Sequence, residues 1–172
     1  MTTRRSSGIL LFRRSGGRLE VLLAHPGGPY FAKRDAGNWT IPKGQPAGED
    51  DLWLVATREF GEETGHVLAN VCVAEAAPME LGTIVLGSGK VVHGWAVEGD
   101  LEPAAVVSNE FEIEWPPRSG SLQRYPEIDR VAWLEPGEAR RRIHPAQAAF
   151  IDRLEAALGS TPGSVPGAQP GS

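Results

Sequence analysis

The sequence GQPAGEDDLWLVATREFGEETGH, residues 44–66, places Arg58, Glu59, Glu62 and Glu63 close together just before Gly65. If the segment is helical, Glu59, Glu62 and Glu63 stand at positions i, i+3 and i+4, and such residues share one helix face. Carboxylates crowded on one face repel each other. A divalent cation offsets this repulsion, because Mg²⁺ binds carboxylate oxygens together with substrate phosphates. The segment therefore predicts either metal-assisted chemistry on a phosphate compound or an ordinary solvated acidic face.

The same segment predicts a helix over residues 51–64. Asp50 or Asp51 can cap its N-terminus, and Gly65 is a residue type that commonly follows a helix C-terminus. Four apolar residues recur at helical spacing and should face the core: Leu52, Val55, Ala56 and Phe60. The glutamates then lie largely on the other side of the helix, toward a cleft.

The rest of the chain alternates between apolar runs and turn signals. Residues 7–14 and 19–25 predict a hairpin joined by Gly16 and Gly17, and Pro42-Lys43-Gly44 predicts a turn. Further strands or extended segments are expected at residues 39–41, 67–73, 79–86, 91–97 and 131–134. A last helix is expected at residues 136–158, interrupted at Pro145.

Composition limits the class of protein. The 172 residues carry a net charge of −5 and one cysteine. This charge argues against broad binding to nucleic acid or to an anionic membrane. Cys72, in an apolar run, is expected in the core, and the absence of a disulfide framework fits a reducing cytoplasm. Residues 1–158 are expected to form one domain, and the Gly-, Pro- and Ser-rich residues 159–172 a disordered tail.

Six residues of the first segment fit the pattern G-x5-E-x7-R-E-U-x-E-E-x-G-U, where U is a bulky apolar residue: Gly44, Arg58, Glu59, Glu62, Glu63 and Gly65. This segment resembles the Nudix box, and the chain is similar to Nudix hydrolases. It departs from the pattern at Asp50, where a glutamate is expected, and at His66, where an apolar residue is expected. The resemblance implies an α/β fold, the α/β/α sandwich with a mixed β-sheet.

The resemblance also implies a chemistry. Nudix enzymes cleave a P–O–P bond in nucleoside diphosphate derivatives, with Mg²⁺ or sometimes Mn²⁺ as cofactor. The implied metal ligands are Glu59, Glu62, Glu63 and the backbone carbonyl of Lys43, and Arg58 would hold the glutamates in place through charge-assisted hydrogen bonds. Arg58 could instead form an ordinary surface ion pair. The general base is open between Glu59, Glu62 and a carboxylate outside the box.

Two groups of acids compete for that outside role. Glu110, Glu112 and Glu114 alternate in the sequence NEFEIE, so on a strand they share one face. The alternative for them is a solvent-facing strand edge. Glu127 and Asp129, in RYPEIDR, are the other candidates.

Several residues could contact the substrate. Lys43 could bind a phosphate, and Tyr30 or Trp39 could stack on a nucleobase, although such aromatic residues more often lie in the core. Outer phosphates could be contacted by Lys90, Arg118 and Arg124. The lead-in W-x-I-P-K-G, residues 39–44, is similar to that of Nudix enzymes that cleave diadenosine polyphosphates, which favours a dinucleoside polyphosphate as the substrate. Nucleoside triphosphates (including oxidised ones), ADP-ribose, and a sensor that binds a nucleotide without cleaving it are the alternatives.

Overall fold

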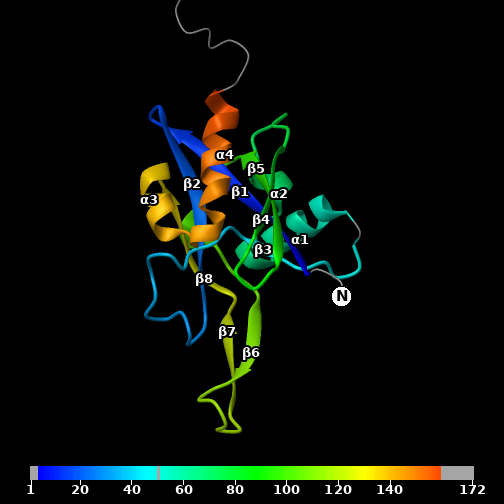
Figure 1. The fold of residues 1–172 in the computed structure, drawn as a ribbon, viewed down its shortest axis with the longest axis vertical. Helices are drawn as coiled ribbons and strands as arrows, with labels where there is room; N and C mark the ends of the chain where they lie inside the picture. Colours follow the sequence, from blue (N-terminus) through cyan, green and yellow to red (C-terminus); the bar gives the residue numbers. More distant parts are fainter. Residues whose placement is uncertain (1–3, 50, 160–172) are drawn as a thin grey trace, which may run out of the picture.

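The computed structural model describes residues 4–49 and 51–159 (Figure 1). Its centre is a mixed sheet in the order β4-β5-β1-β2-β8, in which β1 and β5 are parallel and the other pairs are antiparallel. The strands are β1 (Arg5–Ser15), β2 (Arg18–Pro26), β4 (Met79–Val85), β5 (Val91–Glu98) and β8 (Ile128–Leu134). The predicted N-terminal hairpin is confirmed, with Ser15 paired to Arg18.

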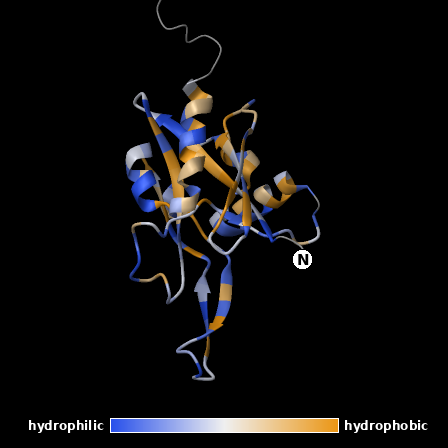
Figure 2. Cartoon of the chain, in the orientation of Figure 1, coloured by the Kyte–Doolittle hydropathy of each residue, from blue (hydrophilic) through white to orange (hydrophobic). Residues whose placement is uncertain are grey.

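Helices cover both faces of this sheet. Alternate residues of β1 point in opposite directions. On one face Ile9 and Leu11 share a core with α1 (Leu52–Thr64) and α2 (Leu68–Val71); on the other, Leu10 and Phe12 share a core with α3 (Pro136–Arg142) and α4 (Ala148–Gly159). Figure 2 shows the hydrophobic colouring concentrated in the strands between these layers. The expected α/β/α sandwich with a mixed sheet is confirmed.

The segment that leads into α1 lies between β1 and β2. Thr40 exchanges backbone hydrogen bonds with Ala24 of β2, and the carbonyl of Pro42 accepts from the N–H of Ile9. Lys43 and Gly44 form a two-residue strand, β3 (Lys43–Gly44), that pairs with β1. The expectation of a turn at residues 42–44 is therefore wrong, because the backbone groups of Lys43 and Gly44 are held in the sheet ladder.

A second contact fixes this segment from the far end of the chain. Gln147, at the end of a short 3₁₀ turn (Pro145–Gln147), is buried. Its Oε1 accepts a hydrogen bond from the N–H of Ile41 at 3.1 Å, and its Nε2 donates to Thr40 Oγ1 at 3.0 Å. The predicted interruption of the last helix at Pro145 is confirmed by this turn between α3 and α4.

The remaining strands form a separate hairpin that projects from the body of the molecule (Figure 1). It consists of β6 (Glu110–Glu114) and β7 (Leu122–Pro126), paired in register from Glu110 with Pro126 to Glu114 with Leu122. Because β7 has few apolar residues, its sequence did not indicate a strand.

The structure corrects the expectation for residues 67–73. A strand was predicted from their apolar residues, but they contain the short helix α2, in which Leu68 is the buried residue. The chain leaves α1 through the left-handed Gly65 and turns directly into α2, and only an isolated antiparallel bridge between Cys72 and Gly99 follows it. Cys72 is partly buried and packs against the edge of the core on the α1 side of the sheet.

Asp50 and residues 160–172 lie outside the described residues. The predicted cap at Asp50 and most of the predicted tail therefore lie outside them as well. Within the described residues, no helix is long and apolar enough to cross a membrane.

Candidate active site

The helix α1 begins and ends close to the predicted residues. The Asp51 side chain accepts a hydrogen bond from the N–H of Trp53 at 2.9 Å, which caps the N-terminus, and Gly65 ends the helix with φ of 74°. Val55, Ala56 and Phe60 are buried as expected, whereas Leu52 is half-buried.

Two of the three glutamates turn inward from α1 toward β3. Glu59 is 8 % exposed and Glu63 6 % exposed, whereas Glu62 is exposed. The Glu59 carboxyl packs directly on Gly44, where an added Cβ would overlap it. The glycine at this position is therefore required by the close approach of a carboxylate to the backbone.

Glu63 is the most strongly perturbed acid of this group. Its Oε2 accepts a hydrogen bond from the backbone N–H of Lys43 at 3.0 Å. Burial raises the pKa of Glu63 to about 8, against the opposing effects of that hydrogen bond and the Lys43 charge. The carboxylates of Glu59 and Glu127 raise the pKa further. Negative charge at Glu63 is therefore costly unless a cation binds nearby.

Arg58 holds the exposed side of the array. Its Nη1 donates to Glu59 Oε1 at 2.9 Å and to both oxygens of Glu62 at 3.1 Å. Its Nη2 donates to the carbonyl of Gln45 at 2.8 Å, and its Nε donates to Glu49. The Arg58 guanidinium lowers the pKa of Glu49 to about 2. The alternative of an ordinary surface ion pair does not fit a guanidinium with five bonded acceptor oxygens.

Glu49 is a partner that sequence reasoning missed. It stands nine positions before Arg58. The only sequence signal for Glu49 was its position beside Asp50 in the Nudix box. Its contact with Arg58 depends on how the loop before α1 folds back.

Of the acids outside the box, Glu127 lies beside the glutamates. Burial raises its pKa, and the nearby charge of Glu62 raises it further. Glu127 occupies the link between β7 and β8, where its backbone N–H donates to the carbonyl of Asn109 and its carbonyl accepts from the N–H of Gly27. Among the described residues its carboxylate has no hydrogen-bond partner.

The other acidic candidates are exposed or bonded to other groups. The Glu110, Glu112 and Glu114 side chains are exposed on the projecting hairpin. Asp129 forms a contact of 2.8 Å with Nδ1 of the buried His25.

Two lysines supply positive charge beside the acids. Lys90 follows the β4–β5 turn, and its pKa is lowered by burial and then by the charges of Lys43 and Arg4, while Glu59 and Glu63 oppose this. Within residues 4–49 and 51–159, neither lysine ammonium has a hydrogen-bond or ion-pair partner. They are suited to bind an anion next to the glutamates.

The two aromatic candidates differ in position. Trp39 is 2 % exposed, and its Nε1 donates to Asp35 at 2.6 Å. The guanidinium groups of Arg130 and Arg142 lie over its ring. The structure thus favours the core alternative for Trp39. Tyr30, in contrast, is 53 % exposed.

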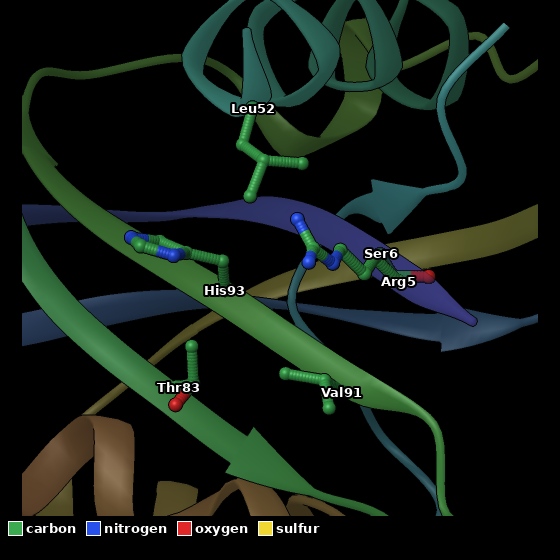
Figure 3. A pocket seen from close by; sticks show the side chains of 6 residues that line it. All are labelled: Arg5, Ser6, Leu52, Thr83, Val91 and His93. Carbon is green, nitrogen blue, oxygen red and sulfur yellow. The ribbon is translucent and has the colours of Figure 1, made fainter. Parts of the chain in front are cut away.

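A cavity of about 340 Å³ lies beside the start of α1 (Figure 3). Its lining residues are Arg5, Ser6, Leu52, Thr83, Val91 and His93, so none of the candidate site residues lines it. Next to it, Ser7 Oγ donates to the carbonyl of Leu52 at 2.6 Å and fastens the start of α1 to β1.

The acids do not form a ready-made metal site. In the described part of the chain, no three His, Cys, Asp or Glu side chains are placed so that they could hold an ion as they stand. Arg58 bonds oxygens of Glu59 and Glu62 that a metal would need, and Glu63 faces the backbone of Lys43. Metal binding would therefore require these side chains to rearrange.

Comparison with known proteins agrees with the fold. The sequence model of the NUDIX domain matches residues 2–154. No curated protein matches the chain.

Solved structures with the same fold are distant in sequence. An Ap4A hydrolase from C. elegans, in a binary complex, is 20% identical and covers 91% of this chain and 98% of its own, with a TM-score of 0.60. The NUDIX domain of Shewanella oneidensis NrtR, complexed with ADP ribose, is 15% identical, covers 92% and 90%, and has a TM-score of 0.61. RenU, a Nudix hydrolase from M. smegmatis, is 22% identical, covers 94% and 90%, and has a TM-score of 0.58.

Proposed function

Because this chain belongs to the Nudix hydrolase family, we propose that it is a divalent-metal-dependent pyrophosphohydrolase of nucleoside diphosphate derivatives, with dinucleoside polyphosphates as the favoured substrates. One observation carries the proposal: Glu59, Glu63 and Glu127 are gathered at one place with raised pKa values, and the exposed Glu62 lies beside Glu127. Buried carboxyls that repel one another destabilise the fold when they ionise, and groups perturbed in this way cluster at functional sites.

The donor set fits a hard divalent cation. Mg²⁺ and Mn²⁺ prefer oxygen ligands, and the acids here supply only oxygens. Glu59, Glu62, Glu63 and the Lys43 carbonyl would hold the ion. Gly44 leaves the space that the Glu59 carboxyl occupies. When bound, the metal neutralises phosphate oxygens and lowers the pKa of a coordinated water.

The protein's own groups would do the rest. Lys43 and Lys90 would bind the phosphate chain, since both ammonium groups lack partners in the described residues and lie on the side of Glu59 and Glu63. Arg58 would keep Glu59 and Glu62 in position from the solvent side.

Glu127 is the proposed proton acceptor for the attacking water. The box glutamates are already bonded to Arg58 or to the Lys43 backbone, while Glu127 is free of such bonds among the described residues. Its raised pKa brings it closer to neutral pH, where a general base is most effective.

The rival from another class is a domain that binds nucleotides without cleaving them. All three box glutamates are present in this chain, and two of them are buried at the site. This favours catalysis over sensing.

The test is phosphate release from a panel of nucleotides with and without Mg²⁺, with products separated by chromatography. Glu127→Gln should lower turnover roughly 10²- to 10⁴-fold, as expected for loss of a general base, and Glu62→Gln should remove most turnover. The matched control is Glu112→Gln on the exposed hairpin face, which should retain full activity. Tight nucleotide binding without turnover in the parent protein would favour the sensor.

A further inference from the structure

The projecting hairpin begins at the acids of the site. The N–H of Asn109, just before β6, donates to the backbone carbonyl of Glu62 in α1 at 2.8 Å. The N–H of Glu127, just after β7, donates to the Asn109 carbonyl at 2.9 Å, and the N–H of Gly27 donates to the Glu127 carbonyl at 2.8 Å. Three separate segments thus meet beside the glutamates.

From this point the loop that follows β2 runs along the hairpin. Gly27 packs on the backbone of Pro126, where an added Cβ would overlap the Pro126 carbonyl. Gly28 lies under the Phe111 ring, and a Cβ there would be 2.7 Å from its Cζ. The two glycines allow this close approach. We call residues 27–31 together with residues 110–126 the arm.

An aromatic pair stands at the outer end of the arm. The rings of Tyr30 and Trp115 meet edge to face, with centroids 5.1 Å apart. The N–H of Trp115 donates to the carbonyl of Ser121, six residues from Glu127. At about 3.4 Å per residue, the pair lies roughly 20 Å along the strands from Glu127.

This outer end has the chemistry of a nucleotide-binding surface. In the described part of the chain, several large apolar residues are strongly exposed, and Tyr30 is the only aromatic residue among them. The cations Lys33, in the same loop, and Arg118, at the hairpin tip, have no ion-pair partner among the described residues. Exposed aromatic rings stack on nucleobases, and free cations attract phosphates.

We propose that Tyr30 and Trp115 bind a nucleobase at the end of the substrate remote from the attacked phosphorus, so that the arm selects substrates with a nucleoside at both ends of the phosphate chain. The inference rests on the proposed function, because it takes the glutamates at the base of the arm as the reacting end. The inference also accounts for the projecting hairpin. A nucleobase bound far from the acids requires a protein surface that extends to it, and the hairpin provides that surface.

The test compares two substrates with the same number of phosphates, diadenosine tetraphosphate and adenosine 5′-tetraphosphate. Tyr30→Ala and Trp115→Ala should lower kcat/KM for the dinucleotide roughly 5- to 150-fold, the range for losing one base–aromatic stack. For the mononucleotide, kcat/KM should stay within twofold of the parent protein's. Tyr30→Phe, which keeps the ring, should behave as the parent. Leu122→Ala, also exposed on the hairpin, is the matched control.

An equal fall for both substrates, or no fall for the dinucleotide in Tyr30→Ala, would overturn the proposal. Because Tyr30 is exposed, its variant is expected to fold even if Trp115→Ala distorts the hairpin. Titration of each protein with the two nucleotides in Mg²⁺-free buffer, followed by calorimetry, separates this inference from the proposed function. A parent protein that hydrolyses neither nucleotide but binds the dinucleotide more tightly than Tyr30→Ala does would support the arm and refute the enzyme. Equal affinities would refute the arm.

Discussion

Glu63→Gln should make the metal-free protein more stable at alkaline pH. The Glu63 carboxyl is nearly buried, and burial raises its pKa from 4.5 to about 8. The folded state therefore holds the Glu63 proton more tightly than the unfolded state does. The stabilisation from that proton is complete below pH 4.5, and it is lost as the pH rises toward 8.

The magnitude follows from the same values. Raising the pKa of Glu63 from 4.5 to about 8 corresponds to about 5 kcal/mol of unfolding free energy, at about 1.4 kcal/mol per pH unit. This is an upper limit, because water that reaches the carboxylate when α1 moves reduces the cost of ionisation. Glutamine keeps the shape and an oxygen for the Lys43 N–H, and it has no proton to lose.

The assay is urea unfolding in EDTA at pH 5 and at pH 8.5. We expect the parent protein to lose several kcal/mol between the two conditions, within the limit of about 5 kcal/mol for Glu63 plus smaller effects of the same sign from Glu59 and Glu127. Glu63→Gln should lose much less, whereas Glu112→Gln should follow the parent. Parallel losses in the parent and in Glu63→Gln would refute the reasoning, since Glu63 would then be solvated.

Gly44→Ala should remove most turnover in the phosphate-release assay with little change in fold, because the added Cβ displaces the Glu59 carboxyl. The control is Gly87→Ala, whose Cβ meets nothing within 4 Å and which should keep full turnover in the same assay. Arg58→Lys should lower activity or metal affinity roughly 10- to 100-fold, as for other groups that orient metal ligands, and calorimetric titration with Mn²⁺ separates the two effects. Gly65→Ala should lower the unfolding free energy by more than about 1–2 kcal/mol, because Gly65 has a left-handed φ of 74° and an added Cβ would lie 2.7 Å from the Val107 carbonyl oxygen. Denaturant unfolding measures the loss, and an unchanged midpoint would contradict this.

The sequence was most informative where a physical signal is local. The cap at Asp51, the left-handed Gly65 and the apolar spacing between them define α1, and the structure places its ends as predicted. The three glutamates follow from that helix. The sheet order was not accessible in this way, since the parallel pairing of β1 with β5 joins residues far apart in the chain. The family resemblance supplied the sandwich with a mixed sheet, but not the order of the strands.

From the sequence, the site residues outside the Nudix box could be predicted only as a set of candidates. Glu127 and Asp129 are two residues apart, and nothing in their sequence distinguishes them. The structure does so through Asn109, whose backbone places Glu127 beside α1, and through His25, which engages Asp129. Lys90 lies near the acids because β5 pairs with β1. This pairing depends on the strand order of the sheet, which the sequence did not reveal.

The buried Gln147 has a consequence for how the protein is made. The segment that leads into α1 depends on the Gln147 amide, which lies 106 positions after Ile41 in the chain. A ribosome releases the glutamates long before it releases this residue, and until then the N–H of Ile41 lacks its buried acceptor. The growing chain should therefore remain without activity until Gln147 has left the ribosome and its amide can accept the hydrogen bond from Ile41.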